Sequence, residues 1–185
     1  MKHATLRTTV SLALSPTALI PSPGRAARVT EISKNANAAL NTLYSTNPAA
    51  RAIGRKAKAV LVFPRIIKGG LKVGGQLGNG ALIINGRTAG YYNTVAACDR
   101  FQAGLRQFSY AMFFMNDAVL TCLNESEGWE VGSAPSLVVV DTGIAKSLST
   151  ATLQKGIYVF FFGQKGLMDG IGLQGTKITR YTSNE

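Results

Sequence analysis

The chain has 185 residues, of which 46% are hydrophobic and 16% charged, so it is long enough for one domain with a substantial core and too apolar for a disordered chain. Twenty lysine and arginine residues against nine acidic residues give a formal net charge of +11, which predicts attraction to polyanions such as phosphate head groups or nucleic acid. No apolar run reaches the roughly 20 residues needed to cross a bilayer, so no membrane-spanning segment is expected.

The N-terminal segment, residues 1–26, has features of a secretion signal. Lys2 and Arg7 give a positively charged start, and Val10–Ile20 gives a short apolar stretch that serine and proline interrupt. The residues that follow lack a clean A-x-A cleavage site, and a disordered tail is the alternative. We therefore expect residues 27–185 to form a single domain that is secreted or periplasmic, or that otherwise lies at the cytoplasmic membrane surface.

Two helices are predicted before the first strand. Within Val29–Tyr44 the apolar residues recur at spacings of three and four, the pattern of one face of an amphipathic helix. Asn47 and Pro48 predict the start of a second helix, because asparagine is a good N-cap and proline fits the first helical position. This helix is predicted to carry Arg51, Arg55, Lys56 and Lys58. It leads into Ala59–Phe63, whose apolar run is typical of a buried strand that Pro64 ends.

A curved sheet is predicted for most of the remaining chain. Eight glycines from Gly69 to Gly90 separate short apolar pieces, which indicates bends or close backbone approaches. Asn85-Gly86 lies between two apolar runs and is the strongest two-residue hairpin signal. Further strands are predicted over residues 108–115, 136–141, 156–162 and 177–181. Asn116 is expected to cap a short helix that runs from Asp117 to about Glu127 and stops at Gly128.

This order of elements indicates an α+β fold, with N-terminal helices followed by a curved, mostly antiparallel β-sheet with one inserted short helix. Alternating β-α-β units are absent from the pattern. Cys98 and Cys122 lie far apart in the sequence, with no CxxC motif, and are interpreted as two small buried hydrophobes, with a disulfide as the alternative.

Few side chains are suited to catalysis or metal binding. The only histidine is His3, in the segment with signal features, which argues against Ser-His-Asp or Cys-His catalysis and most zinc sites in residues 27–185. Four acids lie around the short helix, where a solvated surface is the ordinary explanation and a catalytic pair the alternative; they are Asp117, Glu125, Glu127 and Glu130. The glycine-rich segments depart from phosphate-loop and dinucleotide motifs. We expect no enzyme, no cofactor and no metal.

The basic residues are concentrated towards the N-terminus. Residues 1–72 hold twelve of the twenty cations and one acid, Glu31, whereas the rest of the chain is balanced. Six cations occur close together in the sequence and are the predicted lipid-binding residues: Arg55, Lys56, Lys58, Arg65, Lys68 and Lys72. Because no acid occurs between Glu31 and Asp99, a binding surface is favoured over an ordinary solvated face. Near an anionic bilayer each cation contributes on the order of 1 kcal/mol.

Several segments resemble the SYLF-domain family, of the bacterial single-domain type, in order and spacing. They are KAKAVLVFPRIIKGG (56–70), the glycine pair 74–75, GYYN (90–93), SEGW (126–129), FGQKGLM (162–168) and LQGTKI (173–178). The resemblance covers about Leu40 to Tyr181 and implies a compact fold of antiparallel sheet and helices. It also implies a lipid-binding module, with phosphoinositide and actin-filament binding in eukaryotic members and secreted or envelope-associated bacterial members.

The resemblance brings no catalytic residue with it. It carries Lys56, Lys58, Arg65 and Lys68 over as matches to the family's basic strand entry. The chain departs from the family at Cys98-Asp99-Arg100, where small residues are usual, and its N-terminal segment lacks the lipid-attachment cysteine of some bacterial relatives.

The function expected from these observations is non-enzymatic binding of anionic phospholipid at a membrane surface through a basic patch. The alternative is a protein-interaction or scaffold module, which includes filament binding, with no lipid role. Nucleic-acid binding is a third hypothesis and needs exposed aromatic side chains beside the cations, for which Phe63, Tyr91 and Tyr92 are the candidates.

Overall fold

The computed structural model describes residues 23–70, 74–98, 106–125, 128–131, 137–140, 156–165, 173 and 175–181. In chain order the elements are α1 (Pro23–Thr46), α2 (Pro48–Gly54), β1 (Ala59–Gly70), β2 (Gly74–Ile84), β3 (Arg87–Cys98), β4 (Arg106–Phe114), α3 (Asp117–Glu125), β5 (Trp129–Glu130), β6 (Leu137–Val140), β7 (Ile157–Lys165) and β8 (Thr176–Arg180). Residues 1–22, most of the segment with signal features, lie outside the described residues, and α1 begins earlier than its apolar spacing predicts.

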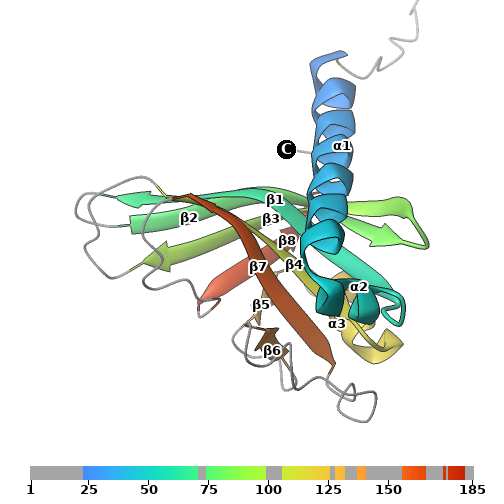
Figure 1. Cartoon of the computed structure of the whole chain (residues 1–185). Helices are drawn as coiled ribbons and strands as arrows, with labels where there is room; N and C mark the ends of the chain where they lie inside the picture. Colours follow the sequence, from blue (N-terminus) through green and yellow to red (C-terminus); the bar gives the residue numbers. More distant parts are fainter. Residues whose placement is uncertain are drawn as a thin grey trace, which may run out of the picture.

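The described strands form one sheet in the order β5-β8-β3-β2-β1-β4-β7-β6. Neighbouring strands pair antiparallel, except that β6 and β7 pair parallel. Figure 1 shows the sheet curling, with α1 standing across the strands and its N-terminal end projecting beyond them. The predicted α+β fold of N-terminal helices and a curved, mostly antiparallel sheet with one inserted short helix is confirmed.

The curl gives the sheet a concave inner face and a convex outer face. Phe114 of β4 and Trp129 of β5 lie five strands apart in the sheet order, yet their ring centroids are only 6.2 Å apart across the inner face. Leu123 of α3 is buried in the same inner core. The outer face packs against α1 and α2, where Leu43 and Ile53 are buried with apolar side chains of β1, β2, β4 and β7.

Pro64 lies inside β1, so the prediction that the strand ends there is wrong. From Phe63 to Ile66 the strand advances by three residues while its partner β4 advances by two, which is a one-residue β-bulge. Proline has no N–H to donate to the ladder, and the bulge leaves it out of the pairing. The Ser109 hydroxyl donates to the Pro64 carbonyl at 2.8 Å, which satisfies the acceptor that the bulge frees.

The bulge decides which side chains of β1 point inward. Strict alternation from Phe63 would direct Arg65 to the inner face and Ile66 to the outer face. The extra residue reverses this order, so Ile66 is 0% exposed in the inner core and Arg65 is exposed beside α1. The same shift directs Lys68 inward.

Two glycines let β2 run close to the bulged strand. A Cβ added at Gly80 would lie 2.5 Å from the carbonyl oxygen of Val62, and one added at Gly78 would lie 2.8 Å from that of Arg65. Backbone atoms at these distances cannot give way, so any side chain would push the strands apart. The predicted close backbone approach is confirmed at these two positions.

Most local predictions are confirmed. Asn85 (φ 50°) and Gly86 (φ 75°) form the two-residue turn between β2 and β3. The side chains of Asn47 and Asn116 each accept a backbone N–H bond at 3.0 Å and cap α2 and α3. The four later strands are β4, β6, β7 and β8, within a few residues of their predicted bounds. The two-residue β5 was too short to leave a pattern.

The prediction for the cysteines is wrong at Cys122. Its thiol is free and exposed on α3, where the next residue, Leu123, is the one that α3 buries. The side chain of Cys98 lies outside the described residues.

Candidate functional site

The six predicted lipid-binding residues do not form one cluster. Arg55, Lys56 and Lys58 are exposed in the turn between α2 and β1, after the last residue of α2. The second helix therefore ends before these residues, and the prediction that it carries them is wrong. At about 3.3 Å per residue, Lys58 and Lys68 lie roughly 30 Å apart along the strand, so a run that is dense in sequence is spread over the molecule.

The six predicted cations are also closer to acidic side chains than the sequence indicates. Lys58 Nζ lies 3.6 Å from Asp117 Oδ2, at the first residue of α3, with side chains 56% and 78% exposed. No acid occurs between Glu31 and Asp99 in the sequence, yet an acid lies beside Lys58 in the structure. The reason is that β1 and β4 are neighbours in the sheet and α3 follows β4. An exposed pair of this kind is weak, and it still lowers the local positive charge.

The remaining three cations separate by face. Arg65 points outward beside α1, whereas Lys68 is directed to the inner face and is partly buried. Lys72 lies outside the described residues. The structure thus brings together three of the predicted residues, in the α2–β1 turn, and places Arg65 in a different setting.

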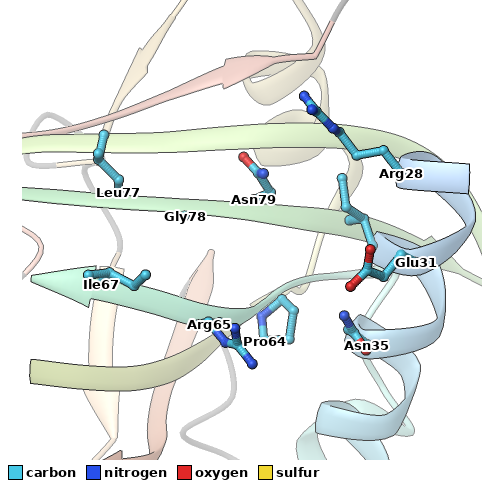
Figure 2. Close-up of a pocket in the computed structure, with 10 residues that line it drawn as sticks. Arg28, Glu31, Asn35, Pro64, Arg65, Ile67, Leu77, Gly78 and Asn79 are labelled. Carbon is cyan, nitrogen blue, oxygen red and sulfur yellow. The ribbon is translucent and has the colours of Figure 1, made fainter. Parts of the chain in front are cut away.

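Arg65 borders a groove of about 370 Å³ between α1 and the strands β1 and β2. Figure 2 shows Arg28, Glu31 and Asn35 projecting from one side of α1, with Arg28 and Arg65 at opposite sides of the groove. The groove is mixed in character, with two guanidinium groups and one carboxylate towards α1. Ile67 and Leu77 line its other end.

An exposed apolar row continues the groove across the outer face. Ile67, Leu77 and Val95 are direct cross-strand neighbours on β1, β2 and β3, and they are 42%, 60% and 48% exposed. Lys177 of β8 pairs with Val95 at the end of the row and itself pairs with Glu130 of β5. Adjacent exposed apolar side chains bordered by cations indicate an interaction surface better than a single exposed leucine does.

Sequence reasoning missed Arg28, Leu77 and Val95 as members of this surface. The alternation of β2 and β3 does carry a signal, because Leu77 and Val95 occur where a strand with one covered face should have a polar residue. This signal can be interpreted only when the strand pairing is known, because the pairing shows which part of the outer face α1 leaves uncovered.

The aromatic residues proposed for nucleic-acid stacking are not available. Phe63 and Tyr92 are 0% and 1% exposed in the inner core. Tyr91 packs beneath α1, and its hydroxyl lies 2.8 Å from that of Ser33. Base stacking needs an exposed ring face, so this hypothesis loses the residues on which it depended.

The described part of the chain offers little acid-base chemistry. Burial raises the pKa of Tyr44, Tyr92 and Tyr110, which keeps these hydroxyls protonated at neutral pH. Of the four acids around α3, Asp117 and Glu130 are exposed, as expected for a solvated surface. The described residues contain no group of three or more histidine, cysteine or acidic side chains placed to hold a metal ion. The absence of enzyme activity, cofactor and metal stays a prediction.

None of the helices in the described ranges is long and apolar enough to span a membrane. The chain matches no protein-family model and no curated protein. The resemblance to the SYLF-domain family therefore stays a prediction that rests on the segments quoted above.

Proposed function

We propose that the protein is a non-enzymatic module that binds anionic phospholipid at a membrane surface. The observation that carries the proposal is the outer surface, by which we mean the apolar row Ile67, Leu77 and Val95 together with the adjoining groove and its two arginines, Arg28 and Arg65. Its apolar side chains and cations are complementary to a bilayer interface, where apolar tails lie beneath anionic head groups.

The energetic contributions are individually small and act together. Moving each half-exposed apolar side chain into the interface stabilises binding by roughly 1 kcal/mol. Each cation near an anionic surface adds about the same amount, and the long stem of arginine suits the boundary between apolar and polar layers. Glu31 in the groove and Glu130 beyond Lys177 oppose part of this attraction. The expected attachment is therefore reversible and sensitive to salt.

The cations of the α2–β1 turn have a secondary role in this proposal. They lie more than 20 Å along the strand from Ile67, at about 3.3 Å per residue, and Lys58 is next to Asp117. At physiological salt the Debye length is about 8 Å, so these charges assist approach more than they hold the bound state.

Sedimentation with vesicles tests the proposal. The full chain should sediment with phosphatidylcholine vesicles that contain phosphatidylserine, should not sediment with phosphatidylcholine alone, and should bind less as salt is raised. Equal binding to both vesicle types, or no binding, contradicts the proposal. Sedimentation with protein filaments in the absence of any vesicle binding would instead favour the scaffold alternative.

Matched variants locate the contact surface. Ile67→Ser combined with Leu77→Ser should weaken vesicle binding about thirtyfold, because two apolar contributions of roughly 1 kcal/mol each are lost. Val139→Ser removes an apolar side chain that is 40% exposed on β6, away from the row, and should leave binding unchanged. Arg65→Gln should weaken binding more than Arg87→Gln, which changes an exposed cation beside the β2–β3 turn.

A further inference from the structure

The groove beside α1 carries charges of both signs that do not neutralise one another. Arg28 and Glu31 line it from α1, and Arg65 lines it from β1 (Figure 2). All three side chains are exposed, and none of them forms an ion pair or a hydrogen bond with another residue that the structure describes. Two cations and one carboxylate therefore face the same space of about 370 Å³ without pairing there.

The missing ion pair is informative because Arg28 and Glu31 lie three residues apart on one helix. Side chains at this spacing are neighbours on a helix surface, and opposite charges there are favourable. Figure 2 instead shows the Arg28 side chain extending away from the Glu31 carboxylate. Both groups are therefore available to a ligand, and the carboxylate is the only acid among the described residues that line the groove.

Two amides lie beside these charges. Asn35 lies one helical turn beyond the carboxylate on α1, and Asn79 of β2 pairs across the strands with Arg65 of β1. Each amide has donors and an acceptor, so it can contact an anionic or a cationic group. The other end of the groove is apolar and leads to Ile67 and Leu77. The groove is therefore polar beside α1 and apolar towards the exposed row, which orients an amphipathic ligand.

A carboxylate in this groove is unfavourable for a ligand that carries only negative charge. The arginines attract the phosphate of a simple anionic head group, but Glu31 repels it. An ammonium group on the same head group reverses this effect, because it donates hydrogen bonds to the carboxylate. A charged side chain that penalises one ligand and stabilises another is a source of specificity. The described lining has one more cation than acid, so it matches a head group with one more anionic than cationic group.

We propose that the groove selects the phosphatidylserine head group among anionic phospholipids. The phosphate and the carboxylate of this head group each pair with one arginine, whose planar guanidinium group suits both oxyanions. The ammonium group donates to Glu31, and the glycerol and acyl chains follow the apolar end of the groove towards Ile67 and Leu77. This inference rests on the proposed function, because it names the head group that the same outer surface binds.

Sedimentation with vesicles of equal surface charge tests the selectivity. Phosphatidylserine and phosphatidylglycerol have the same net charge, so phosphatidylcholine vesicles with equal fractions of either lipid attract the basic protein equally at long range. The full chain should bind the phosphatidylserine vesicles about fivefold more tightly, which is the size of one exposed ion pair. Equal binding to both vesicle types, or tighter binding to phosphatidylglycerol, overturns the inference and leaves the proposed function intact. Absence of binding to either vesicle type contradicts both.

A change at Glu31 separates ammonium recognition from a general effect of charge. Glu31→Gln should bind phosphatidylglycerol vesicles more tightly than the parent chain does, and its preference for phosphatidylserine should disappear. Asp117→Asn removes an exposed acid that lies beside Lys58 and does not line the groove, so it is the matched control for net charge. This control should raise binding to both vesicle types alike and keep the preference. A Glu31→Gln variant that keeps the preference contradicts the inference.

A change at Arg28 tests the pairing with the serine carboxylate. Arg28→Gln and Lys34→Gln each remove one exposed cation from α1, but only Arg28 lines the groove. Arg28→Gln should weaken binding to phosphatidylserine about threefold more than binding to phosphatidylglycerol, because the glycerol head group has no carboxylate to lose a partner. Lys34→Gln should weaken both alike. The same ratio in the two variants would show that Arg28 does not bind the head group.

Discussion

Under α1 and α2 the sheet is apolar on both faces and its side chains are buried, whereas beyond the Pro64 bulge the two faces reverse the usual distribution. There the inner face buries Gln76 and Thr176, while the outer face exposes Ile67, Leu77 and Val95. Polar groups inside and apolar groups outside both cost stability. One end of the sheet therefore serves folding, and the other departs from the most stable arrangement in the way that binding surfaces do.

The largest expected effect comes from a charge placed on the inner side of the Pro64 bulge. Ile66 is 0% exposed in the inner core, so Ile66→Arg would bury an unpaired guanidinium. Such a burial costs about 3–5 kcal/mol or more, so the variant should fail to unfold cooperatively in urea. Arg65→Ile changes the neighbouring residue, which is exposed on the outer face, and should alter the free energy of unfolding by less than about 0.5 kcal/mol. An Ile66→Arg variant as stable as the parent would disprove the assignment of faces.

The covered and uncovered parts of the outer face should respond differently to the loss of a large side chain. Phe113 is 0% exposed and packs edge to face on Phe160, with ring centroids 5.4 Å apart, so Phe113→Ala should cost about 3–5 kcal/mol. Leu77→Ala should change the free energy of unfolding by less than about 0.5 kcal/mol, because the leucine is 60% exposed. Urea unfolding followed by fluorescence of Trp129, the only tryptophan, measures both. Similar losses at the two positions would contradict the contrast between the two parts.

Stability at alkaline pH tests the satisfied polar pair of the inner face. Burial raises the pKa of Tyr110 above its ordinary value near 10, and the hydrogen bond to Thr94 opposes this in part. Below about pH 10 the hydroxyl is protonated in both states and the contribution is fully present. Above it the unfolded chain loses the proton first, so the free energy of unfolding falls as pH rises, by roughly 1 kcal/mol at pH 11.

The double variant Tyr110→Phe with Thr94→Val removes both partners, so no buried hydroxyl is left unpaired. Its free energy of unfolding should fall less between pH 9 and pH 11 than that of the parent chain. An equal fall would assign the alkaline sensitivity to other tyrosines, of which Tyr92 has a pKa that burial raises and Arg180 lowers.

The smallest expected effect concerns the pair formed by Lys58 and Asp117. Lys58→Ala should change the free energy of unfolding by less than about 0.5 kcal/mol, because both side chains are largely exposed and the pair is screened by salt. A double-mutant cycle with Asp117→Asn measures the pair alone. A coupling above about 1 kcal/mol would mean that the turn cations have a structural role and are not held for a ligand.

Much of the fold was predictable because its signals are local. Asn47 before Pro48 starts α2, Asn85-Gly86 turns the chain between β2 and β3, and Asn116 caps α3, each through hydrogen bonds or dihedral angles within a few residues. Less of the site was predictable. Arg65 was identified, yet its neighbours Arg28 and Leu77 come from other elements, and nothing in the run from Arg55 to Lys72 shows that its cations separate by end and by face.

The sequence by itself determined the class of fold, the order of helices and strands, and the basic character on which the proposed function depends, because composition and short-range patterning act within a few residues. Only the tertiary structure decided which side chains share a surface. Pro64 shifts the alternation of β1 by one residue, so Arg65 lies outside and Lys68 inside. Strand pairing then places Lys68, Gln76 and Thr176 in one row of the inner face, although β8 lies far from β1 and β2 in the chain, since strand pairing and curvature are properties of the whole sheet.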